Sequence, residues 1–280
     1  MSRPAIAGLA EAISASVMQA GSRRVADLAL EFKVSEVTVR RVLDGLERRG
    51  VIRRYHGEAR PYDGDAIPFR MGVRYAEKRA IAELAASLVN EGDSICIEAG
   101  SAAACLAERL KNFRSLTVLT PNLFIARIFR GTKVRVALTG GSYQEESESL
   151  VGPLAVEGIR KVGFSLAFVG ASGYSTAAGF ALNDFARAEV TKAIVSVGAA
   201  VWVISDSSKF GVVRAAPFCT DLSLLAGVIT DSDIPPRFRT ELESAGLRVL
   251  SCKGPLLNHD SGPTARARSG PEITDSDSGV

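Results

Sequence analysis

The chain has 280 residues and a formal net charge of +3, with 46% hydrophobic and 23% charged residues. This length and composition favour two domains with a sizeable core. No apolar run approaches the roughly 20 residues that cross a bilayer. The apolar residues near the N-terminus are spaced as in an amphipathic helix, which argues against a signal peptide. We therefore expect a cytoplasmic protein with no membrane partner.

The cysteine and histidine content argues against a metal centre. The four Cys and two His include no Cys-x-x-Cys pair, so a zinc site is not expected. The four thiols are expected to be buried and reduced, as is usual in cytoplasmic proteins. No feature of the sequence indicates a cofactor.

A basic amphipathic helix is predicted after Ser35, whose side chain suits an N-cap, with Glu36 beside the positive end of the helix dipole. One apolar stripe at helical spacing is formed by Val39, Val42, Leu43 and Leu46. The opposite face carries Thr38, Arg41, Gly45 and Arg48, with Arg40 beside it. Gly45 lowers helix stability but allows a close approach of the backbone to another molecule. Gly50 is expected to end the helix.

An arginine-rich hairpin is predicted next. Val51 and Ile52 have the character of a strand start, and a tight tip is expected to carry Arg53, Arg54 and His56. Residues 1–61 hold 11 Lys and Arg against 7 Asp and Glu, so the excess positive charge lies in this part of the chain.

Helix and hairpin together predict a winged helix-turn-helix, because Arg contacts guanine edges and neutralises phosphates. We expect the partner to be double-stranded operator DNA. The alternative is a helical hairpin with a solvated charged face. The candidate DNA-binding residues are Ser35, Thr38, Arg40, Arg41, Arg48, Arg53 and His56.

This segment resembles the N-terminal domain of the DeoR family of bacterial transcriptional regulators, through the run VADLALEFKVSEVTVRRVLDGLERRGVIRRYHG. The resemblance implies that Thr38, Arg40 and Arg41 contact DNA. Two positions depart from the family pattern. Val42 stands where Asp is usual, and Glu58 follows Gly57 where a second Gly is usual.

After residue 76, helix and strand signals alternate. Helices are predicted over 77–90, 101–111, 122–129, 187–198 and 237–245, and strands over 94–97, 116–119, 134–138, 166–169, 201–204, 225–229 and 248–250. This alternation predicts a largely parallel sheet with helices on both faces, an α/β fold.

Small polar residues follow the predicted strands, where ligands bind in such a sheet. Backbone amides, a helix N-terminus and a nearby Lys together suit an anion. Five loops therefore predict a site for a small polar or phosphorylated ligand. The candidate effector-binding residues are Glu98, Gly100, Ser101, Ala102, Ala103, Asn122, Gly141, Gly170, Ser172 and Lys209.

The large domain also resembles the DeoR effector domain, over roughly 69–251, through the runs EKRAIAELAASLVNEGDSICIEAGS, LTGGSYQEESESLVGPLA and VISDSSKFG. The resemblance implies a Rossmann-like fold shared with ribose-5-phosphate isomerase, and a sensor of a phosphorylated sugar. Ala102 and Ala103 stand where the family has Thr or Ser, and Ser172 where Asp is common, while Lys209 is retained.

We therefore expect a winged helix-turn-helix over 1–61, a linker over 62–76, an effector domain over 77–252 and a disordered tail over 253–280. The expected function is a repressor of a carbohydrate catabolic operon that responds to a sugar phosphate or a related anionic metabolite, acting as a dimer or tetramer. One alternative is a sugar-phosphate isomerase with Glu98, Asp184 or Asp206 as the base. Another is a regulator that has lost small-ligand sensing.

Overall fold

The computed structural model describes residues 3–48, 51–55, 57–61 and 67–252. The predicted tail over 253–280, the predicted helix stop at Gly50 and the candidate residue His56 lie outside the described residues. None of the described helices has an apolar stretch of the length needed to cross a bilayer.

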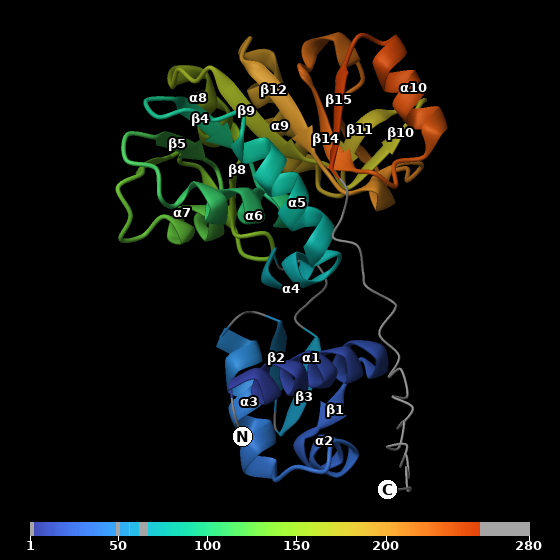
Figure 1. Cartoon of the computed structure of the whole chain (residues 1–280). Coiled ribbons are helices and arrows are strands. Elements are labelled where there is room, and N and C mark those ends of the chain that lie inside the picture. Colours follow the sequence, from blue (N-terminus) through green and yellow to red (C-terminus); the bar gives the residue numbers. More distant parts are fainter. Residues whose placement is uncertain (1–2, 49–50, 56, 62–66, 253–280) are drawn as a thin grey trace, which may run out of the picture.

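The N-terminal unit is a three-helix fold with a small sheet (Figure 1). Its elements are α1 (Arg3–Ala20), β1 (Arg23–Arg24), α2 (Val25–Glu31), α3 (Glu36–Arg48), β2 (Ile52–Tyr55) and β3 (Glu58–Pro61). The predicted stripe of α3 is buried and packs on Ile13 and Val17 of α1 and Leu28 of α2. This unit therefore has a core of its own, which confirms the predicted helix-turn-helix arrangement.

The wing is an antiparallel hairpin in which β3 pairs with β2 on one side and with β1 on the other. Gly57 has φ +83°, a value that glycine adopts at little cost. Arg53 pairs with Arg60 and Arg54 with Ala59. The prediction that Arg53 and Arg54 lie at the tip was therefore wrong, because the strand continues to Tyr55.

The second unit is an α/β domain. Its helices are α4 (Ile67–Gly72), α5 (Tyr75–Ala86), α6 (Ser101–Leu110), α7 (Leu123–Ile128), α8 (Pro153–Lys161), α9 (Phe185–Ser196) and α10 (Pro236–Ser244), with 3-10 turns η1 (Ser207–Lys209) and η2 (Leu222–Leu224). Its strands are β4 (Ser94–Ile97), β5 (Thr117–Thr120), β6 (Arg135–Leu138), β7 (Ser142–Gln144), β8 (Ser149–Val151), β9 (Leu166–Gly170), β10 (Gly173–Ser175), β11 (Gly179–Leu182), β12 (Ala200–Ile204), β13 (Ala216–Cys219), β14 (Gly227–Asp231) and β15 (Arg248–Cys252).

The seven long strands form one parallel sheet in the order β15-β14-β12-β9-β4-β5-β6. Alternate residues of β9 face opposite sides: Ala167 and Val169 join the core with α8, α9 and α10, whereas Leu166 and Phe168 join the core with α5, α6 and α7. Helices therefore cover both faces, as predicted (Figure 1). The chain order reverses between β4 and β9, which places the topological switch point there.

Several elements were not predicted. Helix α8, the hairpin β7-β8 and the small antiparallel sheet β10-β11-β13 occupy the stretches between the predicted strands. The predicted linker over 62–76 also differs from the structure, because it contains α4 and the first residues of α5. Met71, at the end of α4, packs against the core beneath α6. The segment from Ile67 onward is thus part of the second unit.

Candidate nucleic-acid interface and ligand pocket

Helix α3 begins as predicted at the N-cap Ser35. The Ser35 hydroxyl accepts a hydrogen bond from the Thr38 amide at 3.2 Å and lies 2.9 Å from the Thr38 hydroxyl. Ser35 therefore positions Thr38 at the first turn, in addition to any contact of its own with DNA.

The other described candidates lie in α3 and β2. Arg41 is exposed, and a Cβ placed on Gly45 would meet no atom of the described residues within 4 Å. The internal packing therefore does not require glycine at position 45. Arg40 donates to Glu36 at 2.7 Å, one turn earlier. Arg48 lies in the last turn of α3, and Arg53 lies in β2.

Arg54 joins the wing to α3 through ion pairs and a backbone hydrogen bond. Its guanidinium pairs with Asp44 at 2.6 Å and Glu47 at 2.8 Å, and its backbone amide donates to Glu47 at 2.9 Å. These contacts raise the pKa of Arg54 and lower that of Glu47. Arg54 therefore has structural partners in α3, a role that the charge pattern alone did not predict.

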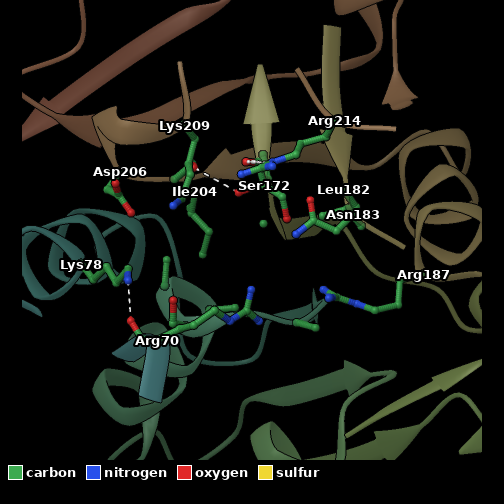
Figure 2. A pocket seen from close by; sticks show the side chains of 18 residues that line it. Arg70, Lys78, Ser172, Leu182, Asn183, Arg187, Ile204, Asp206, Lys209 and Arg214 are labelled. Carbon is green, nitrogen blue, oxygen red and sulfur yellow. Dashed lines mark hydrogen bonds between the residues drawn. The ribbon is translucent and has the colours of Figure 1, made fainter. Parts of the chain in front are cut away.

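A polar cavity of about 210 Å³ lies at the switch point of the large sheet (Figure 2). It is bounded by Gly100–Ala103 after β4 and Gly170–Ser172 after β9, and by Lys209. Seven of the ten predicted effector residues are therefore brought together at one site: Gly100, Ser101, Ala102, Ala103, Gly170, Ser172 and Lys209.

Glycines shape the floor of this cavity. Gly100 is the N-cap of α6 with φ +105°, a conformation that side chains rarely adopt, and it presents the start of the helix to the cavity. A Cβ on Gly170 would lie 3.0 Å from the Ala99 carbonyl oxygen. The free amides at the start of α6 suit an anion.

Glu98 lies behind the lining. Its carboxylate, 2% exposed, accepts from Arg187 at 3.2 Å and from the Gly170 amide at 3.4 Å. Arg187 is 7% exposed, and its buried Nε has no hydrogen-bond partner among the residues that the structure describes. Glu98 thus neutralises and positions Arg187, which lines the cavity, rather than facing the ligand itself.

The loop that carries Lys209 is held by two buried carboxylates. Asp206 caps η1 by accepting from the Ser208 amide at 3.1 Å, and Asp231 accepts from the Ser207 amide at 2.7 Å. Arg74, at the N-cap of α5, lies 3.7 Å from Asp206 and 3.4 Å from Asp231. The position of Lys209 is therefore linked to the junction between α4 and α5.

Cations from outside the predicted loops also line the cavity. Lys78, on α5, donates to the carbonyl oxygens of Arg70 at 2.5 Å and Val73 at 2.6 Å, and its burial lowers its pKa to about 8. Sequence reasoning missed both Lys78 and Arg70. A signal existed for Lys78, because it lies at helical spacing with Ile81, on the apolar face of α5.

Arg214 and Asn183 complete the side of the cavity beside Ser172 (Figure 2). Arg214 donates to the Ser172 carbonyl oxygen at 3.2 Å. No sequence motif marked either residue. Both residues reach the cavity because the small sheet β10-β11-β13, next to which they lie in the chain, folds back over the carboxyl ends of the parallel strands.

Asn122 and Gly141 are not among the residues that line this cavity. The Asn122 side chain is occupied: it accepts from the Ile125 amide at 3.0 Å and donates to Ser147 and Ser149. Gly141 packs against Val151 and Ala155. These two residues follow β5 and β6, farther from the switch point than the loops after β4 and β9.

The charges of the cavity favour an anion. The described lining contains five cationic side chains and one carboxylate, that of Asp206: the cations are Arg70, Lys78, Arg187, Lys209 and Arg214. Asn183, Ser101 and Ser172 add neutral hydrogen-bonding groups suited to hydroxyls. A small ligand with a negative group and several hydroxyls matches this chemistry.

Comparisons with known families give two matches, one over each of the two structural units. Residues 10–63 match the DeoR-like helix-turn-helix domain, and residues 73–232 match the DeoR C terminal sensor domain.

Similar proteins of known name are regulators. The chain is 29% identical to the HTH-type transcriptional regulator GlpR of Haloferax volcanii, over 84% of this chain and 93% of that protein. It is 31% identical to a lactose phosphotransferase system repressor of Staphylococcus epidermidis, over 79% and 90%. These names support the regulator over the enzyme that the sequence left as an alternative.

Among solved structures, the chain is similar to ribose 5-phosphate isomerase A of Methanocaldococcus jannaschii. The identity is 16% and the TM-score is 0.36, over 48% of this chain and 53% of that one. We draw no functional conclusion from this partial likeness.

Proposed function

The chain belongs to the DeoR family of transcriptional regulators, and from this premise we propose that it represses a carbohydrate catabolic operon in response to a phosphorylated sugar or a related anionic metabolite. The winged unit over 1–61 binds operator DNA. The effector occupies the cavity at the switch point, and its binding changes the affinity for DNA.

The DNA-binding part of the proposal is supported by the surface of α3. Its buried stripe fixes the helix on the core, so that Thr38, Arg41 and Gly45 face away from it. Arg side chains on such a face supply base contacts in the major groove. Arg41 is assigned to base edges, and Arg40 and Arg53 to phosphates.

The effector-binding part of the proposal is supported by the excess of cationic side chains in the switch-point cavity. The first-turn amides and the dipole of α6, together with the Lys209 ammonium, converge on the same space. A phosphate at this point would meet both, while the sugar hydroxyls would reach Asn183 and Ser172. The cavity of about 210 Å³ suits a small metabolite.

The proposal is tested by thermal unfolding and calorimetry of the full chain with a panel of pentose and hexose phosphates and the matching unphosphorylated sugars. We expect at least one phosphate to bind, and its unphosphorylated sugar to bind far more weakly. Lys209→Ala should weaken that binding by about tenfold or more, since a charge-assisted hydrogen bond contributes about 1.5–3 kcal/mol.

The matched control is Lys192→Ala on α9, where the exposed Lys192 pairs with Glu189 and does not line the cavity. This variant should bind like the wild type. Absence of binding by every phosphate, or equal affinity of wild type and Lys209→Ala, would contradict the proposed site.

A further inference from the structure

Helix α4 contributes Arg70 to the lining of the switch-point cavity, although this helix lies in the segment that leads from the DNA-binding unit. Figure 2 shows the Arg70 side chain reaching into the cavity from α4, with the Arg187 guanidinium coming toward it from the opposite side. Arg187 is neutralised by Glu98, and within the described part of the chain its buried Nε lacks a hydrogen-bond partner. A space between two guanidinium groups suits an anionic group.

The end of α4 is fastened to the rest of the cavity by charged side chains. Lys78 donates to the carbonyl oxygens of Arg70 and Val73. Arg74 has φ +52° at the junction of α4 and α5 and pairs with Asp206, the carboxylate that caps the Lys209 turn. The end of α4 is therefore held by α5 through Lys78, and the junction that follows it is held to the Lys209 loop through Arg74 and Asp206.

Resting on the proposed function, we propose that Arg70 is the effector contact that links the cavity to the DNA-binding unit. Arg70 and Arg187 hold one anionic group of the effector between them, and this contact fixes α4 against the edge of the sheet. The effector thus acts on DNA binding through a residue of the connecting segment itself.

The short connection makes this coupling effective. Strand β3 ends at Pro61 and α4 begins at Ile67, so five residues join the wing to α4. Five residues span at most about 18 Å. The position of α4 therefore limits where the DNA-binding unit can lie, and a shift of α4 changes these limits. If the effector contacts α4 in only one of its positions, effector binding will shift the equilibrium toward that position of α4.

The test compares wild type, Arg70→Gln, Arg70→Lys and the control Arg79→Gln as full chains. Arg79 is an exposed residue of α5 that pairs with Glu83 and does not line the cavity. The probes are inorganic phosphate and the sugar phosphate of the panel above that binds the wild type with the highest affinity. Calorimetry measures probe affinity, hydrogen exchange follows the amides over 67–74, and gel shift measures affinity for the upstream DNA of the gene.

In the wild type and Arg79→Gln, we expect the probe to slow exchange over 67–74 and to change DNA affinity by about 5- to 150-fold. In Arg70→Gln, probe affinity should fall by about tenfold or more, and both the protection and the DNA response should be lost at saturating probe. Arg70→Lys should restore part of the response. Unchanged unfolding temperature and DNA affinity without probe show that Arg70→Gln is folded.

A wild-type response in saturated Arg70→Gln would overturn this inference and leave the proposed function intact. Loss of probe affinity with an unchanged DNA response would also overturn it, because Arg70 would then bind without coupling. If the wild type binds no probe, the proposed function fails and this inference fails with it.

Discussion

Arg40 and Arg41 are neighbours in α3, yet they lie in different surroundings. Arg40 pairs with Glu36 along the helix, whereas Arg41 lies on the face that carries Thr38 and Gly45. The two side chains are therefore expected to make different contacts with DNA, one with a phosphate and one with base edges.

The first prediction separates these two roles. Arg41→Ala should cost about 1–3 kcal/mol of operator binding and relax sequence specificity, whereas Arg40→Ala should weaken binding to all sequences alike and reduce the salt slope by about one. Affinities for operator and scrambled DNA at several salt concentrations check this. Equal losses on both DNAs for Arg41→Ala would contradict base readout.

The second prediction concerns the ion pair behind the cavity. Glu98→Ala should lower the free energy of unfolding by about 3–5 kcal/mol, because it leaves the Arg187 cation buried without its partner. Glu189→Ala, which breaks the exposed pair with Lys192, should cost at most about 1 kcal/mol. Urea unfolding of both variants measures the difference. Similar small losses would show that Arg187 does not depend on Glu98.

At the scale of the element, Gly45 sits in the middle of α3 without an internal packing reason. The third prediction is that Gly45→Ala raises the free energy of unfolding by about 0.5–1 kcal/mol, and at the same time weakens DNA binding because the added methyl separates the helix from the groove. Gly8→Ala is the matched control, since a Cβ at Gly8 in α1 also meets no described atom within 4 Å.

Both variants should be stabilised when unfolding is measured in urea, but only Gly45→Ala should lose operator affinity. If Gly45→Ala binds the operator as well as Gly8→Ala does, the close approach of the α3 backbone to DNA is disproved.

The elements that could be predicted were those with strong periodic patterns. The stripe of α3 repeats at helical spacing, and the five inner strands of the parallel sheet are apolar runs that are buried between helices on both faces. Helix α8 and strands β7 and β10 are short and lie among Gly and Ser, and strand β13 contains Pro217, so their residues resembled loops. Helix α4 was missed because Pro68 and Gly72 gave it the composition of a linker.

The site could be predicted only where it follows the strand ends. The loops with Gly100 and Gly170 were identified because carboxyl ends of parallel strands share one edge. The same argument placed Asn122 and Gly141 there, although the described lining that follows parallel strands comes from the loops after β4, β9 and β12. Arg70 and Arg214 come from elements outside the parallel sheet, and their positions depend on tertiary packing that no local pattern records.

At the scale of the whole molecule, one winged unit covers too little DNA for a specific site of high affinity. The fourth prediction is therefore that the protein acts as a dimer or tetramer on repeated half-sites, since symmetric assembly matches repeated DNA. Sedimentation of the protein at micromolar concentration, with and without operator DNA, measures its oligomeric state. A monomer that retains tight operator binding would contradict it.

The central claim is that binding of an anionic metabolite in the switch-point cavity is energetically coupled to binding of operator DNA by α3. Thermodynamic linkage requires this coupling to be reciprocal. The most direct measurement is therefore a closed cycle: operator affinity with and without the bound sugar phosphate, and sugar-phosphate affinity with and without operator. We predict that both ratios equal the same factor, between about 5 and 150, and that Lys209→Ala leaves operator affinity without effector unchanged while abolishing the response. A sugar phosphate that binds the cavity and changes operator affinity by no measurable factor would contradict the account.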